Sequence, residues 1–185
     1  METKFQFVTL RWLNQGTVSE KLLDDLREIA EELLSTPDPH LEQVRSGLRE
    51  LLQPSIVRHQ IENGELFILA YINDKPVGVM NVLEKHNRII DHYTAIKPSI
   101  QRSRIYAKLT LDIIRYAEKK RIPFLRRELV TRPSVEWHHK YQRLIASKPH
   151  LSDILSLSLE PGMKGGYETA TFHIRPRVRR KPGAR

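Results

Sequence analysis

The spacing of apolar residues predicts two helices in the first third of the chain. The apolar positions of the first recur every three to four residues, the period of one helix face: Val18, Leu22, Leu26, Ile29 and Leu33. Thr17-Val18-Ser19-Glu20 has the spacing of a capping box at its start. A second helix, over 38–52, begins at Asp38-Pro39, an N-cap acceptor followed by a residue without an N–H. A first strand, over 4–12, precedes both.

The period then changes to that of strands. Compact apolar runs at 65–72, 77–83 and 89–96 predict three strands, and the turn-rich link Asn73-Asp74-Lys75-Pro76 makes the first two a hairpin. Helical spacing returns from Arg104 to Lys120.

The last third of the chain mixes both periods. It predicts a short strand over 124–130 and a helix after Arg132-Pro133-Ser134 whose stripe includes Trp137 and Tyr141. Two alternating segments, on either side of 161–166, predict a terminal hairpin. The order is therefore strand, two helices, three strands, helix, strand, helix and two strands, within one domain over 1–174. The basic segment 175–185 has no residues able to form a core, and we expect a disordered tail there.

Composition narrows the classes of function. With no cysteine, disulfides, thiolate metal sites and cysteine nucleophiles are excluded. The longest apolar run, Leu66 to Ile72, is far shorter than the roughly 20 residues of a membrane span. The N-terminus lacks the apolar core of a secretory signal. We therefore expect a soluble, cytoplasmic protein without a membrane partner.

Positive charge is concentrated in two parts of the chain. The net charge is +9, and residues 97–148 hold 14 Lys and Arg against 4 Asp and Glu, while 175–185 add six more basic residues and no acid. Such a local field suits a phosphorylated cofactor, a nucleic acid or an acidic protein. Solvated helix faces would carry the same charge.

One segment resembles a known signature. The N-acetyltransferases of the GNAT superfamily have an aliphatic residue, Pro, Gln or Arg and two small residues at fixed spacing between their fourth strand and a helix. Here Ile96-Lys97-Pro98-Ser99-Ile100-Gln101-Arg102-Ser103-Arg104-Ile105-Tyr106 matches at the aliphatic, Pro and Gln positions, with Arg and Tyr at the two small positions. The predicted order of elements also resembles that family.

The resemblance implies a fold and a cofactor. The fold is of mixed α/β (α+β) class, with a mainly antiparallel twisted sheet of six to seven strands flanked by about four helices. The cofactor is acetyl-CoA or another acyl-CoA, whose pyrophosphate is gripped by backbone amides at a helix start, where unpaired N–H groups and the helix dipole favour an anion. On this resemblance the cofactor residues are Ile96, Gln101, Arg102, Ser103, Arg104, Ile105, Tyr106 and Ala107. The Arg and Tyr side chains either crowd the pyrophosphate or, for the arginines, replace lost backbone contacts.

The resemblance also implies catalytic roles. Tyr141 matches the tyrosine that protonates the departing CoA thiolate, and the alternative for it is packing with Trp137. A base that neutralises the acceptor amine is expected at Asp91 or His92, which face opposite sides of their strand, with Glu84 a further candidate. His138-His139 lacks a matching ligand pair, so no metal site is expected.

Two functions follow. The first is an acyl-CoA-dependent N-acyltransferase, most simply an acetyltransferase, acting on an unidentified amine. The alternative is an inactive GNAT-like module that binds nucleic acid or an acidic protein through 97–148 and 175–185, with Arg102, Arg104, Arg126, Arg127 and Arg132 on phosphates.

Overall fold

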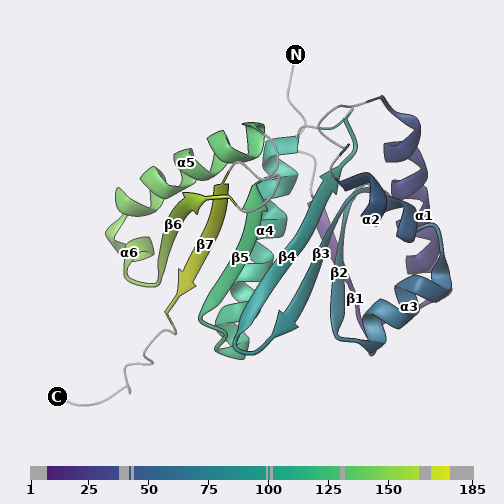
Figure 1. Ribbon diagram of the computed structural model, residues 1–185, viewed down its shortest axis with the longest axis horizontal. Coiled ribbons are helices and arrows are strands. Elements are labelled where there is room, and N and C mark those ends of the chain that lie inside the picture. Colours follow the sequence, from purple (N-terminus) through teal and green to yellow (C-terminus); the bar gives the residue numbers. More distant parts are fainter. Residues whose placement is uncertain are drawn as a thin grey trace. The chain divides into compact units, whose positions relative to one another are not determined.

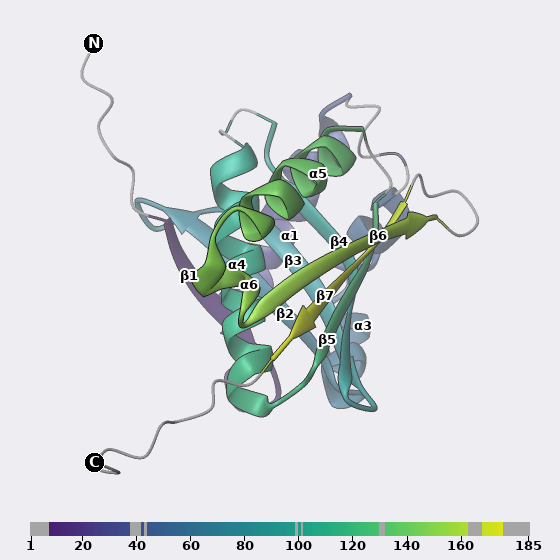
Figure 2. The ribbon, with the colours of Figure 1, turned by 90° about the vertical axis from the view of Figure 1, so that its left-hand side faces the viewer.

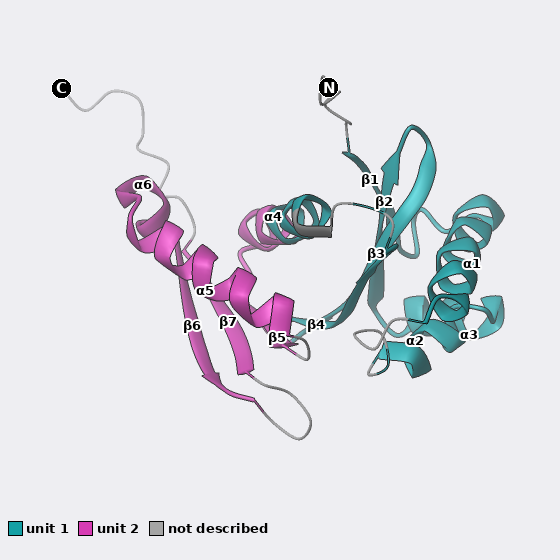
Figure 3. Cartoon of the chain, turned by 90° about the horizontal axis from the view of Figure 1, so that it is seen from above, with its two compact units in different colours: residues 1–85, 90–112 teal, residues 86–89, 113–185 magenta. Residues whose placement is uncertain are grey.

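The computed structural model describes residues 8–37, 42, 44–98, 100, 102–129, 132–162 and 168–175, apart from the side chains of 102 and 103. Figures 1 and 2 show its ribbon from two sides. The chain divides into two compact units, coloured separately in Figure 3. The first unit comprises 1–85 and 90–112, and the second comprises 86–89 and 113–185.

The first unit is a four-stranded antiparallel arrangement with helices on both faces. Its strand order is β1-β2-β3-β4, and β1/β2 and β2/β3 pair antiparallel. Its elements are β1 (Val8–Leu13), α1 (Glu20–Ser35), α2 (Arg45–Glu50), α3 (Pro54–Glu62), β2 (Glu65–Ile72), β3 (Lys75–Lys85), most of β4 (Arg88–Ile96) and the first part of α4 (Arg102–Lys120).

Three helices cover one face of these strands. Figure 3 shows α1, α2 and α3 on one side of β1–β3, with the first part of α4 on the other. The face under α1–α3 is closed by a core in which every fully buried Leu or Ile contributes about 1.5–3 kcal/mol. That core comprises Leu13, Leu23, Leu26, Ile29, Ala30, Leu33, Leu48, Leu51, Val57, Ile61, Phe67, Leu69, Tyr71, Val79 and Ala95.

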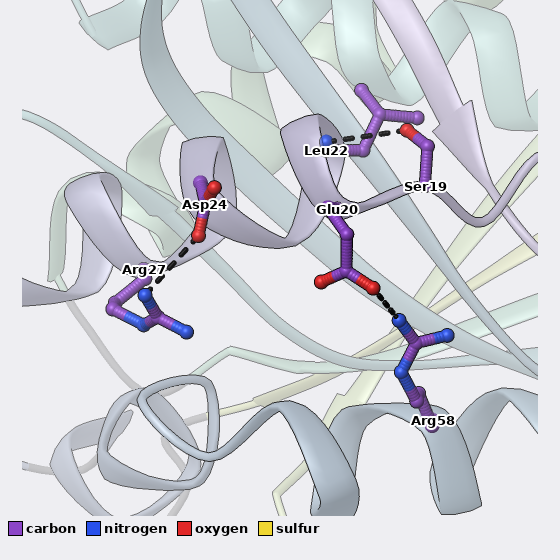
Figure 4. A network of polar contacts seen from close by, with 6 residues as sticks. All are labelled: Ser19, Glu20, Leu22, Asp24, Arg27 and Arg58. Carbon is purple, nitrogen blue, oxygen red and sulfur yellow. Dashed lines mark hydrogen bonds and ion pairs between the residues drawn. The ribbon is translucent and has the colours of Figure 1, made fainter.

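The start of α1 differs from the predicted capping box. The helix begins at Glu20, and Ser19 is its N-cap, with a hydroxyl that accepts from the Leu22 amide at 3.4 Å (Figure 4). Thr17 instead accepts from the Asn14 amide at 3.1 Å in the preceding turn. The Thr17–Glu20 box was therefore wrong, because the cap lies two residues later. Glu20 forms an ion pair with Arg58, which ties α1 to α3.

Two other predicted boundaries also moved. The single helix expected over 38–52 is wrong: within the described residues α2 covers only Arg45–Glu50, and α3 follows at Pro54, where no element was expected. Residues 38–41 and 43 of that prediction lie outside the described residues. The β2–β3 link is only Asn73-Asp74, both at positive φ (51° and 58°), as a two-residue hairpin turn requires, and Lys75 and Pro76 already belong to β3.

The second unit is a three-stranded antiparallel arrangement of order β5-β7-β6. Helix α5 lies along it, and the Gln142 side chain donates to the Leu157 carbonyl of β6 at 2.9 Å. Figures 1 and 2 show α5 beside the final hairpin. The elements are the end of α4, β5 (Phe124–Leu129), α5 (Arg132–Ala146), α6 (Pro149–Ser152), β6 (Leu155–Pro161) and β7 (Glu168–Ile174).

The predicted fold class is confirmed. The described residues form seven strands, mostly antiparallel, and six helices, the two beyond the expected four being short. Each of the seven predicted strands has a counterpart, and α1, α4 and α5 lie where apolar spacing indicated helices. Residues 4–7 and 130 of the predicted strands lie outside the described residues. None of the described helices is long and apolar enough to span a membrane. A single domain over 1–174 stays a prediction, and 176–185 lie outside the described residues.

Candidate functional site

Strand β4 is irregular at its centre, where the predicted base residues lie. The Thr94 hydroxyl donates to the Asp91 carboxylate at 3.3 Å. On a regular strand residues three apart face opposite sides, roughly 10 Å apart at their Cα atoms, so this contact requires an extra residue, as in a β-bulge. Tyr93 packs on Gly47 of α2, and His92 contacts Asn81 on the same face. The bulge therefore turns His92 and Tyr93 to one side and Asp91 and Thr94 to the other.

His92 ends a hydrogen-bonded row of side chains across three strands. The Asn81 amide nitrogen on β3 donates to the Glu65 carboxylate on β2 at 2.8 Å, and the Asn81 carbonyl oxygen lies 3.1 Å from His92 Nδ1. The nearer Glu65 oxygen is 3.7 Å from the same nitrogen. Asn81 and Glu65 share the face of Val79 and Phe67, which α1–α3 cover, because residues two apart face the same way.

Burial and charge perturb this row. The Glu65 carboxylate beside the imidazole raises the pKa of His92 against the effect of burial. Burial raises the pKa of Glu65, but the contacts with His92 and Asn81 outweigh it and lower the pKa overall. Burial, with the nearby Glu65, Glu50 and Asp91 carboxylates, raises the pKa of Tyr93 and keeps its phenol protonated. The contacts within the row thus favour the protonated form of His92 and the ionised form of Glu65.

The predicted cofactor turn lies at the start of α4. Gln101 is outside the described residues, and for Arg102 and Ser103 only the backbone, the first two residues of the helix, is described. The Arg104 side chain is exposed, whereas Ile105 is buried in the core. The amides of the first four helical residues have no intrahelical acceptor, and the first turn carries no acidic residue.

The remaining turn residues frame that helix start. Ile96 is buried at the end of β4, and Tyr106 and Ala107 are half-buried. Lys97, next in the chain, is buried and its ammonium group lies 2.6 Å from Glu32 and 3.3 Å from Glu28 of α1. This pair of contacts ties the beginning of the turn to α1.

Tyr141 lies in the second unit, on α5. Its ring stacks on Trp137 at 4.8 Å between centroids and meets Phe172 of β7 at 6.1 Å. Burial raises the pKa of the Tyr141 phenol, so it stays protonated at neutral pH. No described residue hydrogen-bonds its hydroxyl. The stripe packing that was the alternative reading is present, and it leaves the hydroxyl available.

Two buried residues of the second unit, His138 and Arg127, bear on two further predictions from the sequence, those on metal binding and on nucleic-acid binding. His138 donates from Nδ1 to the Ser134 carbonyl at 2.7 Å, and its Nε2 accepts from Arg127 at 3.5 Å. Burial, then the Arg127 charge, lowers the pKa of His138 to about 3. Arg127 is only 2% exposed, so its expected contact with a nucleic-acid phosphate is wrong. Among the described residues no cluster of His, Cys, Asp and Glu could hold a metal ion.

The structure brings together only some of the predicted site. Asp91, His92 and the turn at the start of α4 share the first unit, and Tyr141 belongs to the second. Sequence reasoning missed Glu65 and Asn81. The signal for Asn81 was a single amide inside the apolar run 77–83, whereas Glu65, a lone acid at a strand start, gave no signal.

Comparison with known proteins finds likeness in structure alone. No protein-family model matches the chain, and no curated protein matches it in sequence. The PaiA N-acetyltransferase of Thermoplasma acidophilum, solved in complex with coenzyme A, superposes with a TM-score of 0.57 at 18% identity, over 91% of this chain and 99% of that one. The ribosomal-protein-S18-alanine N-acetyltransferase of Escherichia coli gives 0.56 at 12% identity, over 95% and 99%.

A third solved structure is also an acetyltransferase by name. An aminoglycoside 6'-acetyltransferase type Ii gives a TM-score of 0.55 at 12% identity, over 92% of this chain and 99% of that one. At these identities the likeness concerns the fold. The three neighbours are all N-acetyltransferases or acetyltransferases by name. The chain therefore has the fold of the GNAT superfamily of N-acetyltransferases.

Proposed function

We propose that the chain is an acyl-CoA-dependent N-acyltransferase, which transfers acetyl from acetyl-CoA to an amine. The observation that carries the proposal is the start of α4, a 19-residue helix that follows β4 with no acidic residue in its first turn and with Arg104 exposed. The fold, shared with an acetyltransferase solved in complex with coenzyme A, supports it.

The residues at this helix start fit a phosphate-bearing group. The amides of residues 102–105 have no acceptor within the helix, and the helix dipole places partial positive charge beside them. Ile105, the β-branched residue of the turn, points into the core, so it does not cover these amides. The Arg104 side chain is exposed and does not pack in the core. Its guanidinium can therefore bind a phosphate group bidentately at the surface. Guanidinium contacts then replace the close backbone approach that glycine would permit.

The chain's own residues supply the proton transfers. Bound acyl-CoA would supply a thioester, an acyl group activated toward an amine. Asp91 or His92 takes a proton from the acceptor ammonium group, because only a neutral amine is nucleophilic. On the sequence resemblance Tyr141 is the acid for the leaving sulfur, and burial raises its pKa and so keeps the phenol proton that this role requires.

Titration calorimetry of acetyl-CoA against two charge-reversal variants tests the proposal. Arg104→Glu removes the phosphate ligand and should weaken binding by about tenfold to a hundredfold, the worth of hydrogen bonds to a charged group. Arg115→Glu makes the same charge change on the exposed side of the same helix, about 16 Å further along its axis, and should bind nearly as the wild type.

Comparison of the two variants distinguishes a loss of cofactor binding from a loss of folded protein. A new carboxylate in the first turn of a helix is favourable to the dipole, so Arg104→Glu should keep or raise the melting temperature while it loses affinity. Equal affinity of both variants, or no heat with the wild type, would refute cofactor binding at this turn. Salt-sensitive binding of RNA or DNA by a wild type that ignores acetyl-CoA would favour the alternative module.

A further inference from the structure

The hydrogen bonds of the Glu65–Asn81–His92 row fix which nitrogen of His92 carries the proton. A carboxylate only accepts, so the Asn81 atom 2.8 Å from Glu65 is its NH₂ group. The other Asn81 atom is then the carbonyl oxygen, which also only accepts. His92 Nδ1, at 3.1 Å from it, must therefore be the N–H donor. In the neutral imidazole the lone pair then lies on Nε2.

Nε2 is the nitrogen that is free to act. No described residue hydrogen-bonds it, and the His92 side chain is 37% exposed while that of Glu65, behind it, is only 17% exposed. The row thus has a buried end on β2 and an open end on β4. Because the bulge turns Asp91 away to hydrogen-bond Thr94, the two base candidates of the sequence are not equivalent.

We propose that His92 is the base of acceptor deprotonation and that Glu65 and Asn81 are its positioning residues. The proposal rests on the proposed acyl transfer and names the residues that make it work. Asn81 holds the ring through Nδ1, and the Glu65 carboxylate stabilises the imidazolium that forms. The acceptor is an amine that arrives as ammonium, because the base has one proton to remove.

The proton and electron count is complete with these groups. The Nε2 lone pair of His92 takes one proton from the ammonium group, and the freed nitrogen lone pair forms the C–N bond as the C–S bond breaks. The sulfur keeps the C–S electron pair and takes a proton from the general acid, which regains one from water. The nitrogen loses its second proton to water. The imidazolium then releases its proton, so the net products are an amide, a thiol and one proton.

The charged groups around His92 set the direction of its pH dependence. Glu65 on β2 faces it, and Asn81 on β3 does not titrate. Asp91 and Tyr93 flank it on β4, and Glu50 at the end of α2 lies near Tyr93. Since the carboxylates favour the imidazolium, removal of the Glu65 charge must lower the pKa of His92.

Glu65→Gln tests the inference in two readouts. The first is the ¹⁵N spectrum of His92 across pH in the protein without substrate, where the wild type should show the Nδ1–H tautomer and Glu65→Gln should titrate at lower pH. The second is the pH profile of kcat/KM, which rises with pH as His92 loses its proton. Its acid limb should move to lower pH in Glu65→Gln, in step with the spectrum, and His92→Gln should lose about 10²–10⁴-fold in kcat.

Glu62→Gln is the matched control. It removes an exposed carboxylate three residues earlier, which lies 4.0 Å from His59 and not at His92. It should leave both readouts unchanged, whereas a merely structural role for Glu65 would lower melting temperature without moving the acid limb.

The outcomes separate this inference from the proposed function. If acyl transfer occurs and the acid limb stays in place although the His92 spectrum moves, His92 is not the base and the inference falls while the function stands. An Nε2–H tautomer in the wild type would also overturn it. If the folded wild type transfers no acyl group to any amine at any pH, the proposed function falls and the inference with it.

Discussion

The buried imidazole of His138 should lower the stability of the chain in acid by a measurable amount. Its ring is enclosed, with Nδ1 donating to Ser134 and Nε2 facing the Arg127 guanidinium. A proton on Nε2 would bring two positive charges together without water. The neutral form is therefore the folded form, and burial with the Arg127 charge lowers the pKa of His138 to about 3.

The sign and size of the effect follow from this shift. The unfolded chain binds the His138 proton below about pH 6.5, whereas the folded chain binds it only below about pH 3, so stability is lost as pH falls between these values. At about 1.4 kcal/mol per pH unit, His138 should remove about 3 kcal/mol of unfolding free energy between pH 7 and pH 4.

Urea unfolding of the wild type and of His138→Asn, each at pH 7 and pH 4, measures this loss of unfolding free energy. The Asn amide can still donate to Ser134 but binds no proton, so the variant's loss between the two pH values should be smaller by about 3 kcal/mol. His59→Asn, on an exposed ring, serves as control and should follow the wild type. An equal pH loss in His138→Asn and wild type would refute the buried, neutral histidine.

Three further substitutions test other parts of the structure. Gly47→Ala places a Cβ 2.8 Å from Cε1 of the Tyr93 ring and should destabilise by about 1–3 kcal/mol in urea unfolding, a cost that Tyr93→Leu should relieve; a neutral effect would contradict the tight contact. Tyr141→Phe keeps the Trp137 stack and removes the acid, so kcat should fall about 10²–10⁴-fold at unchanged acetyl-CoA affinity, and full turnover would exclude Tyr141 as the acid. Arg58→Ala breaks an exposed ion pair with Glu20 and should cost under about 1 kcal/mol; a larger loss would mean that the pair ties α1 to α3 more strongly than its exposure implies.

Apolar spacing predicted most elements because α1, β6 and β7 bury mainly one face, whereas β2 and β3 are buried on both faces and therefore form continuous apolar runs. The apolar stripe of α1 and the apolar alternation of β6 and β7 correspond to their buried positions. Helix α3 was missed because its nine residues bury only Val57 and Ile61, a pattern too short to show a period. Pro76 was placed in a turn, yet it lies in β3 opposite Tyr71, where an irregular register permits a residue without an N–H.

The candidate site was less accessible from sequence, since it depends on register. Glu65, Asn81 and His92 are 16 and 11 positions apart, and only the pairing of β2 with β3 and the bulge in β4 bring them into one row. That bulge also gives Asp91 and His92 different partners, Thr94 and Asn81, a difference that alternation alone did not predict. The buried state of Arg127 was equally hidden, because in sequence it looks like its exposed neighbours.

Acyl transfer itself is the claim on which the rest depends, and mass spectrometry of acetyl-CoA incubated with the full chain and a panel of primary amines and polyamines tests it most directly. The account predicts an acetylated amine and free CoA thiol that appear together in equal amounts, at a rate that rises with pH through the titration of His92. Loss of acetyl-CoA no faster than in buffer without protein, for every amine in the panel, would contradict it.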